Sequence, residues 1–297
     1  MPRLFRLLLW LTALVLGLGW VALSLAKPTL VGFGPGLPEG VAAAVSHTAE
    51  LTTRLGPWLH LVGIGFWLVL AIAADGWGPK PRVYLPAVLS GVLLWTAFFP
   101  LNWWPVAFVA LAPLLTLVRA EGVGRWRRYT AAWVGGLAFG LLDVNWLRHA
   151  HPMMAYFAWP LLSLFLSVYW PLALFLLRRL DRLGKPPLAL TLPVVWVALE
   201  YVKAHWPTGY PFMKWIHCHQ LAGFAWGFLG HTQHANLPLL QSADLGGAYL
   251  PGLAVAAING AAHDWFVRWR PFRFLVNLPR GWVLPVYRRE MVNTAGA

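Results

Sequence analysis

The sequence predicts an all-α fold, a polytopic transmembrane helix bundle with about 8 spans and an interfacial external loop. Of the 297 residues, 59% are hydrophobic and 11% are charged, whereas ordinary globular chains carry roughly 25% charged residues. The mean hydropathy of +0.60 points the same way. A soluble fold of this composition could not cover its surface with polar groups, so the chain is expected to bury its apolar surface in lipid.

Eight apolar stretches are the candidate spans, because a bilayer core needs about 20 apolar residues in helical conformation. Along the chain they are Leu7 to Ala26, Trp58 to Ala74, Val83 to Pro100, Pro105 to Val118, Tyr129 to Trp146, Ala155 to Leu177, Pro187 to Tyr201 and Gly246 to Ala262. The fourth and seventh are short, and each is expected to gain length from flanking aromatic residues or to span only partly. The first could instead be a secretory signal, although its apolar run is longer than that of most signal peptides.

The basic residues indicate the topology. With the N-terminus inside, the external side keeps five of the 23 Lys and Arg residues, and the remaining 18 are cytoplasmic. The five are Lys27, Arg54, Arg148, Lys203 and Lys214. A cytoplasmic excess of basic residues follows the positive-inside rule. The formal net charge of +13 therefore reflects topology, both termini are expected in the cytoplasm, and no nucleic-acid partner is expected.

Three regions do not look like spans. Residues 28–56 are expected to form an external loop that is helical and weakly amphipathic over 41–55. Residues 206–242 are rich in Pro, Gly, His and aromatic residues and are too apolar for a free loop, so they are expected to lie in the outer interface or to fold over the bundle mouth. The Arg-rich tail after the last stretch is expected to lie on the inner membrane surface.

Glu200 lies near the external end of the seventh stretch, and Lys203 follows three residues later on the same helical face. A carboxylate at the centre of a span costs about 2.5 to 3.5 kcal/mol and less near an interface, so Glu200 should face other helices or water. Two interpretations stay open. The pair is either a structural ion pair at the end of the helix or the polar wall of a substrate cavity.

Asp143 is the other intramembrane acid. The sequence favours a structural role for it, as a buried carboxylate bonded to Asn145, to a neighbouring helix or to Arg148. Earlier in the same stretch, Gly136 and Gly140 form a face of small residues, which is expected to let a neighbouring helix approach closely.

Cys218 stands between His217 and His219, which raises the question of a metal site or a cysteine nucleophile. The spacing matches no common zinc pattern, and no Gly-rich elbow or oxyanion loop surrounds the thiol. The sequence therefore predicts no catalytic residue, no metal and no cofactor in this chain.

Several segments in order resemble the membrane domain of bacterial apolipoprotein N-acyltransferase, over Val83 to Asn259. The matching motifs are Leu94 to Pro105, Ala107 to Leu115, the Gly-rich stretch ending in Asn145-Trp146, Leu199 to Lys203, Thr208 to Phe212 and Ala243 to Tyr249. Two positions depart from the family's pattern, because Phe212 stands where the family has Trp and Lys203 stands where it has Arg.

The resemblance implies a membrane domain that opens to the periplasmic leaflet of the bacterial inner membrane. In the family, an external nitrilase-like domain carries a Glu-Lys-Cys triad. Its cysteine takes an acyl chain from phospholipid as a thioester and passes it to the amino group of diacylglyceryl-cysteine, in lipoprotein maturation. The residues after Ala262 contain no cysteine, so this catalytic domain is expected to be missing and the chain is expected to be inactive alone.

Three domains are expected: residues 1–82 as an N-terminal extension with two transmembrane helices, 83–264 as the membrane domain, and 265–297 as a basic cytoplasmic tail. The resemblance implies a lipid-accessible cleft, and the candidate lipid- or substrate-binding residues near its mouth are Glu200, Lys203, Tyr210, Pro211 and Phe212.

The expected partners are phospholipid, a diacylglyceryl lipoprotein and a separate nitrilase-like subunit. Two alternative functions stay open. One is a small-solute or lipid transporter with Asp143 and Glu200 along its path, although paired halves and broken helices are not evident in the sequence. The other is a noncatalytic membrane scaffold.

Overall fold

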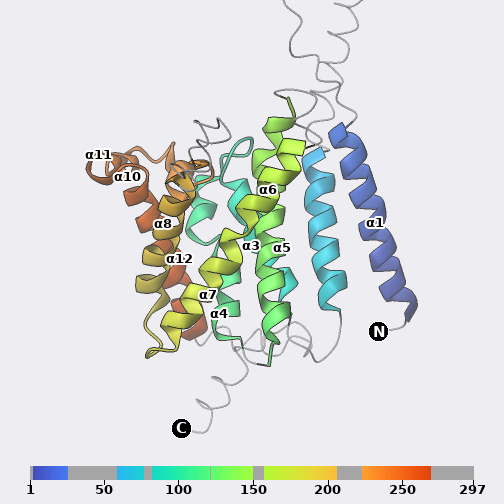
Figure 1. Cartoon of the computed structure of the whole chain (residues 1–297), viewed down its shortest axis with the longest axis horizontal. Helices are drawn as coiled ribbons and strands as arrows, with labels where there is room; N and C mark the ends of the chain where they lie inside the picture. The colour runs from blue at the N-terminus through green and yellow to red at the C-terminus, as the bar shows by residue number, and fades with distance from the viewer. Residues whose placement is uncertain are drawn as a thin grey trace, which may run out of the picture.

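The computed structural model describes residues 3–25, 59–76, 82–120, 122–149, 157–205 and 223–268, and these residues contain no β-strand. Their helices are α1 (Arg3–Leu25), an unlabelled helix Leu59–Asp75, α3 (Tyr84–Thr96), η1 (Trp104–Phe108), α4 (Ala112–Arg119), α5 (Arg125–Asp143), η2 (Val144–His149), α6 (Trp159–Ser167), α7 (Tyr169–Asp181), α8 (Leu188–His205), η4 (Leu229–Gln233), α10 (Leu237–Leu240), α11 (Ala243–Gly246) and α12 (Tyr249–Arg268) (Figure 1). The all-α fold class is confirmed for this part of the chain.

Each of the eight predicted stretches coincides with helical structure. Among the described residues, three helices are long and apolar enough to cross a membrane: Leu4–Ala22 within α1, Trp159–Asp181 across α6 and α7, and α8. The helix Leu59–Asp75, α3 and the η1 to α4 segment are apolar but shorter. The described helices are thus compatible with a membrane helix bundle, and a total of about 8 crossings stays a prediction.

The long helices run roughly side by side (Figure 1). The helix α1 and the helix Leu59–Asp75 lie at one side of the bundle, while α8 and α12 lie at the other. These last two pack antiparallel, because Gly260 contacts Leu188 at one end while Gly252 lies beside Glu200 near the other. The start of α1 and the end of α12 lie at the same end of the molecule (Figure 1).

Glycines allow the helix α5 to contact its neighbours at very short range. A Cβ atom on Gly135 would overlap the carbonyl oxygen of Ala87 in α3. On other sides of α5, Gly136 faces α7, and a Cβ on Gly140 would lie 3.3 Å from the Cα of Ser163 in α6. The prediction that Gly136 and Gly140 form a close packing face is confirmed, and small residues of this kind are what membrane helices use at their contacts.

The fourth predicted stretch is broken into η1 and α4. The break leaves backbone groups without helical partners, and side chains from other helices bond them. Asn259 of α12 accepts a hydrogen bond from the N–H of Leu111 (2.8 Å) and donates one to the carbonyl oxygen of Ala107 (2.7 Å). Ser90 of α3 accepts one from the N–H of Leu114 (2.8 Å). Interrupted backbone at membrane depth is tolerated where protein groups satisfy it in this way.

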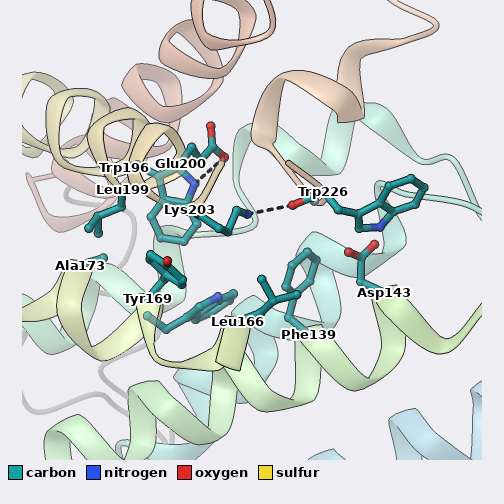
Figure 2. Close-up of a pocket in the computed structure, with 12 residues that line it drawn as sticks. Phe139, Asp143, Leu166, Tyr169, Ala173, Trp196, Leu199, Glu200, Lys203 and Trp226 are labelled. Carbon is teal, nitrogen blue, oxygen red and sulfur yellow. Dashed lines mark hydrogen bonds between the residues drawn. The ribbon is translucent and has the colours of Figure 1, made fainter. Parts of the chain in front are cut away.

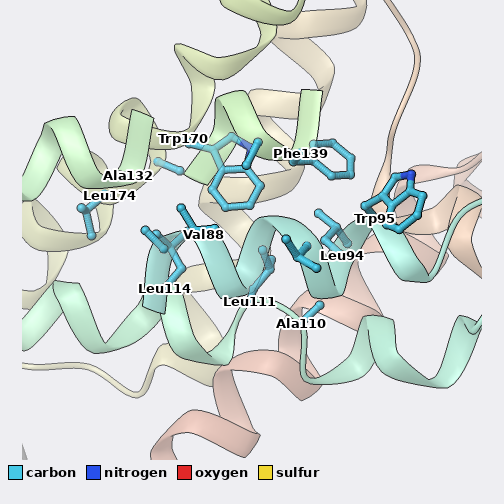
Figure 3. Close-up of a cluster of buried hydrophobic side chains, with 14 of the residues drawn as sticks. Val88, Leu94, Trp95, Ala110, Leu111, Leu114, Ala132, Phe139, Trp170 and Leu174 are labelled. Carbon is cyan, nitrogen blue, oxygen red and sulfur yellow. The ribbon is translucent and has the colours of Figure 1, made fainter. Parts of the chain in front are cut away.

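The core lies where α3, α4, α5 and α7 meet (Figure 3). Its side chains are apolar and nearly all fully buried; they include Val88, Leu94, Trp95, Leu111, Leu114, Ala132, Phe139, Trp170 and Leu174. By contrast, α1 exposes most of its large apolar side chains. Exposed apolar surface of this extent is expected where lipid, and not protein, covers a helix.

Ion pairs hold the end of the bundle where α12 ends. Arg119 at the end of α4 pairs with Asp181 (2.9 Å) and Asp264 (3.5 Å), which joins α4, α7 and α12. Asp75 accepts hydrogen bonds from three backbone N–H groups at the start of α3 and pairs with Arg127 (3.2 Å). A carboxylate at a helix N-terminus satisfies donors that have no partner within the helix.

Some predicted regions fall only partly within the structure. The predicted helical part of the first external loop, 41–55, lies outside the described residues. In the 206–242 segment, residues 223–242 are described; they contain η4 and α10 and pack over the end of α8. The predicted tail begins at 265, whereas α12 continues to Arg268.

Candidate functional site

Two adjoining cavities lie at the end of the bundle where α8 ends. The smaller cavity has a volume of about 40 Å³ and is lined by side chains from α5, α6, α7 and α8 together with residues 226–227 (Figure 2). The larger cavity has a volume of about 700 Å³. It lies between the loop that follows α3, the end of α5, and the segment 226–234. The smaller one has room for little more than water, whereas the larger is in the range of ligand pockets.

Glu200 is held in the wall of the smaller cavity. Its side chain is 3% exposed, and its Oε1 atom accepts hydrogen bonds from the Trp196 indole N–H (3.1 Å) and the Leu229 backbone N–H (2.8 Å). The other oxygen, Oε2, has no hydrogen-bond partner and lies beside Gly252 of α12. Glu200 therefore connects α8 to the segment that contains Leu229, and only one of its two carboxylate oxygens accepts hydrogen bonds.

Lys203 points toward the segment 226–228 (Figure 2). Its ammonium group donates a hydrogen bond to the carbonyl oxygen of Trp226 (2.9 Å) and lies 4.8 Å from the ring centroid of Phe228. In the described structure no hydrogen bond joins Lys203 directly to Glu200, yet Lys203 interacts electrostatically with both Glu200 and Asp143. Lys203 thus stands between the two acids and fixes the segment that separates the cavities.

Asp143, Trp226 and Gly227 form the wall that the two cavities share. The Trp226 side chain lies beside the Asp143 carboxylate (Figure 2). Gly227 has a φ of 65°, and a Cβ there would lie 2.9 Å from the Asp143 Oδ2 atom. Only glycine fits this conformation and this approach. The shared wall therefore depends on a precise contact between the end of α5 and residues 226–227.

The larger cavity is mostly apolar. Its apolar wall comes from Phe98, Phe99, Pro100, Leu142, Trp146 and Trp226. Its polar side chains are Asn102, Asp143, Asn145 and the histidines 60, 231 and 234. An apolar chamber with a few polar groups in its wall is typical of a site for a ligand with a long apolar portion.

The histidines do not form a metal centre in this part of the chain. Among the described residues, no group of three or more His, Cys, Asp or Glu side chains could hold a metal ion. Desolvation and the positive charge of Lys203 lower the pKa of His231 below its ordinary value. His231 is therefore a neutral imidazole at pH 7. Cys218, His217 and His219 lie outside the described residues.

The structure places two of the five predicted site residues. Glu200 and Lys203 lie in the wall of the smaller cavity, while Tyr210, Pro211 and Phe212 lie outside the described residues. Sequence reasoning did not select several residues that line the larger cavity: His60, Trp226 and Asn102. They come from distant segments, and no spacing or motif in the sequence brings them together.

The region that builds both cavities matches a known family. The family model for the apolipoprotein N-acyltransferase N-terminal domain matches residues 90–261, more than half of the chain. The chain belongs to this family. The resemblance carried by the sequence motifs is thereby confirmed, and this N-terminal domain contains every residue that lines the two cavities except His60.

Individual relatives agree with the family. The chain is 34% identical to the apolipoprotein N-acyltransferase of Rhodopirellula baltica over 189 residues, which cover 60% of the chain and 30% of that relative. It is 31% identical to that of Geobacter metallireducens (60% and 32% covered) and 30% identical to that of Gloeobacter violaceus (62% and 34% covered). The chain thus spans about a third of the length of the curated relatives it matches.

Proposed function

We propose that this chain is the membrane part of an apolipoprotein N-acyltransferase-like enzyme. In this proposal it serves lipoprotein maturation in the bacterial inner membrane, with both termini cytoplasmic and the two cavities at the periplasmic side. Its role is to hold phospholipid and the diacylglyceryl lipoprotein while an acyl chain passes from the first to the N-terminus of the second. Residues 83–264 form the lipid-holding unit, 1–82 are an extension, and 265–297 are a basic cytoplasmic tail.

The larger cavity is the observation that carries this proposal. A volume of about 700 Å³ with a mostly apolar wall accommodates acyl chains, and the polar groups on that wall suit an ester or a head group. Its position at one end of the bundle agrees with access from one leaflet. The names of the relatives supply the reaction, since they are N-acyltransferases that act on apolipoproteins.

Glu200 and Lys203 have a supporting role in this proposal. Lys203 holds the Trp226 carbonyl group and Glu200 holds the Leu229 N–H group, so the two side chains fix the segment that forms one wall of the larger cavity. We propose that they position the polar end of the lipid, together with the segment that contains Tyr210, Pro211 and Phe212.

Acyl transfer itself is assigned to groups other than those described in the bundle. A thioester mechanism needs a thiolate, a base and an oxyanion site, and Cys218 is the sole thiol among the 297 residues. We propose that a nitrilase-like unit supplies this chemistry above the cavities.

Photo-crosslinking tests the lipid-holding role. Purified protein in nanodiscs would receive phosphatidylethanolamine with a diazirine at the end of one acyl chain, and crosslinked peptides would be mapped by mass spectrometry. The proposal predicts crosslinks to peptides that contain Phe98, Leu142 or Trp146. Glu200→Gln should lower this crosslinking by about threefold or more, whereas Asp244→Asn, an exposed acid in α11, should not.

Two results would count against this role. Crosslinks confined to the outer faces of α1 and α6, with none in the cavity wall, would favour a scaffold that merely sits in lipid. A loss of thermal stability in Glu200→Gln with unchanged cavity crosslinking would show that Glu200 has a purely structural role.

A further inference from the structure

Two arginines converge on one helix end, at the end of the bundle where α12 ends. Arg128 at the start of α5 donates a hydrogen bond to the carbonyl oxygen of Ala120. Arg178 near the end of α7 donates to the carbonyl oxygens of Leu117 (3.3 Å) and Val118. The last carbonyl groups of a helix have no partners within it, so both guanidinium groups cap α4. A helix C-terminus carries only about half a negative charge, which offsets a small part of the two positive charges.

In the described part of the chain, no ion pair joins these two guanidinium groups to an acid. The described acids at this end, Asp75, Asp181 and Asp264, each pair with another arginine. Asp181 also attracts Arg178, without a direct ion pair. Arg128 is 6% exposed, and the Nε atoms of Arg128 and Arg178 are buried and make no hydrogen bond among the described residues. A buried positive charge without a paired carboxylate is costly, so the arrangement favours an added anion.

Neighbouring residues increase the positive charge. Arg182 follows Arg178 by about one turn, is exposed, and interacts electrostatically with both Arg128 and Arg178. Outside the described ranges, Glu121 is the one acid between α4 and α5, and it can compensate one of these charges at most. The residues after Arg268 contain five Arg and one Glu, so they add more positive than negative charge. An excess of positive charge therefore remains at this end of the bundle.

One face of α7 leads from these arginines along the apolar surface of the bundle. Its exposed side chains, at helical spacing, are Leu172, Phe175, Arg179 and Arg182. Leu172 and Phe175 are 39% and 46% exposed, and the ring centroid of Tyr129 in α5 lies 6.4 Å from that of Phe175. Trp126, an exposed residue at the start of α5, is of the type that lies at a membrane–water interface. Basic groups beside an apolar strip at this depth fit a phospholipid better than a free ion.

We propose that Arg128, Arg178 and Arg182 form a second lipid site, which binds the phosphate group of an anionic phospholipid in the cytoplasmic leaflet. Arg178 and Arg182 would donate hydrogen bonds to the phosphate oxygens, since planar guanidinium groups suit phosphate. Arg128, which is buried, would contribute its charge. The acyl chain would lie along Leu172 and Phe175. Basic pockets between membrane helices on the cytoplasmic side are known to bind anionic head groups.

This site is separate from the cavities of the proposed function. Arg128 and Asp143 lie at opposite ends of α5, so the arginines are about 20 Å from the cavities. The leaflet follows from the orientation that the basic residues predict, and the site does not require acyl transfer. A phosphatidylethanolamine head group carries its own ammonium group, so the arginines should prefer a head group with a net negative charge, such as that of phosphatidylglycerol.

Competitive photo-crosslinking of the full chain in phosphatidylcholine nanodiscs tests the inference. The probe is phosphatidylglycerol with a diazirine in its acyl chain near the glycerol, and crosslinked peptides are mapped by mass spectrometry. Crosslinks should fall on peptides that contain Leu172 or Phe175. Unlabelled phosphatidylglycerol should displace the probe about fivefold more effectively than phosphatidylethanolamine. Inorganic phosphate at constant ionic strength should not displace it, and displacement by phosphate would show an ion site in place of a lipid site.

Variants assign the preference to the three arginines. Arg182→Gln should lower the preference for phosphatidylglycerol by about threefold or more. Arg6→Gln is the matched control, because it removes an exposed arginine at the same end of the bundle but on α1 (Figure 1), and it should match the wild type. Arg178→Lys keeps the charge without the planar guanidinium group, so it should retain more of the preference than Arg178→Gln. If Arg178→Gln does not fold, the comparison of Arg182→Gln with Arg6→Gln carries the test.

Two further results would overturn the inference. Equal displacement of the probe by phosphatidylglycerol and phosphatidylethanolamine would show that the arginines only cap α4. An equal effect of Arg182→Gln and Arg6→Gln would show a general attraction of anionic lipid to the basic surface. Neither result bears on crosslinks in the cavity wall at the other end of the bundle, so this inference and the proposed function can fail independently.

Discussion

At the scale of single residues, the bundle depends on polar side chains that bond the backbone of another helix. Asn259 is fully buried and bonds both sides of the break between η1 and α4. Ser90 and Glu200 do the same for Leu114 and Leu229. No water is present in lipid to bond a backbone group that has no partner within its helix. These side chains supply the missing partner and so allow the backbone to depart from a continuous helix.

Asn259→Leu should therefore destabilise the protein strongly although it keeps the side-chain size. The substitution leaves the Leu111 N–H and the Ala107 carbonyl group buried without partners, and we expect a loss of about 2 to 4 kcal/mol in the free energy of unfolding. An SDS titration in mixed micelles measures this loss. The control Gln241→Leu replaces an exposed amide and should change stability by less than about 0.5 kcal/mol. Equal effects of the two substitutions would show that the bonds of Asn259 matter little.

The sequence predicted some site residues and missed others for a physical reason. Glu200 and Lys203 could be recognised because a charged residue inside an apolar stretch stands out in the sequence whatever the fold. Trp226 could not, because its role arises only when the segment 223–228 returns to the end of α8 and meets Asp143.

At the scale of elements, apolar length and composition were enough to predict the helices but not their interruptions. Continuous apolar runs predicted single spans at 105–118 and 155–177. The first is divided into η1 and α4, and the second into α6 and α7 near Val168. Pro171 explains the second break locally, since it has no N–H to bond the carbonyl group of Ser167. The first break depends on Asn259, about 150 positions away, which no local pattern reveals. The break between η1 and α4 was accordingly not evident in the sequence.

Gly135→Ala tests the close packing of α5 against α3. The added methyl group would overlap the Ala87 carbonyl oxygen, so the helices must separate, and we expect a cost of about 1 to 3 kcal/mol in the same titration. Gly19→Ala is the matched control, because a Cβ there would lie 3.9 Å from Val62, an ordinary contact. Since alanine favours helix over glycine, the control should be neutral or slightly stabilising. A neutral result at Gly135 would contradict the close contact.

At the scale of the whole molecule, the basic residues predict the side of the membrane to which the cavities open. The positive-inside rule places the start of α5 in the cytoplasm and the end of α8 outside. Both cavities lie at the end of α8, so they would open toward the external leaflet, where a lipoprotein substrate is found in the proposed function.

Thiol labelling tests this orientation. Cys218 is the sole cysteine, and a membrane-impermeant maleimide should label it in intact spheroplasts. In a Cys218→Ser background, Trp126→Cys introduces a thiol at an exposed position at the start of α5, which should react only after the membrane is lysed. The reverse pattern, with good labelling of both denatured proteins, would invert the topology.

The most direct measurement of the central claim is acyl transfer by these 297 residues alone. The claim is that the bundle binds and orients lipid and does not itself supply the thiolate, base and oxyanion site of the reaction. Purified protein, given phosphatidylethanolamine and a diacylglyceryl lipopeptide, should yield no triacylated product by mass spectrometry, and Cys218→Ser should change nothing. Adding a nitrilase-like domain in trans should allow transfer. Robust transfer by the isolated chain, abolished by Cys218→Ser, would contradict the account and locate an active site in the His-rich segment.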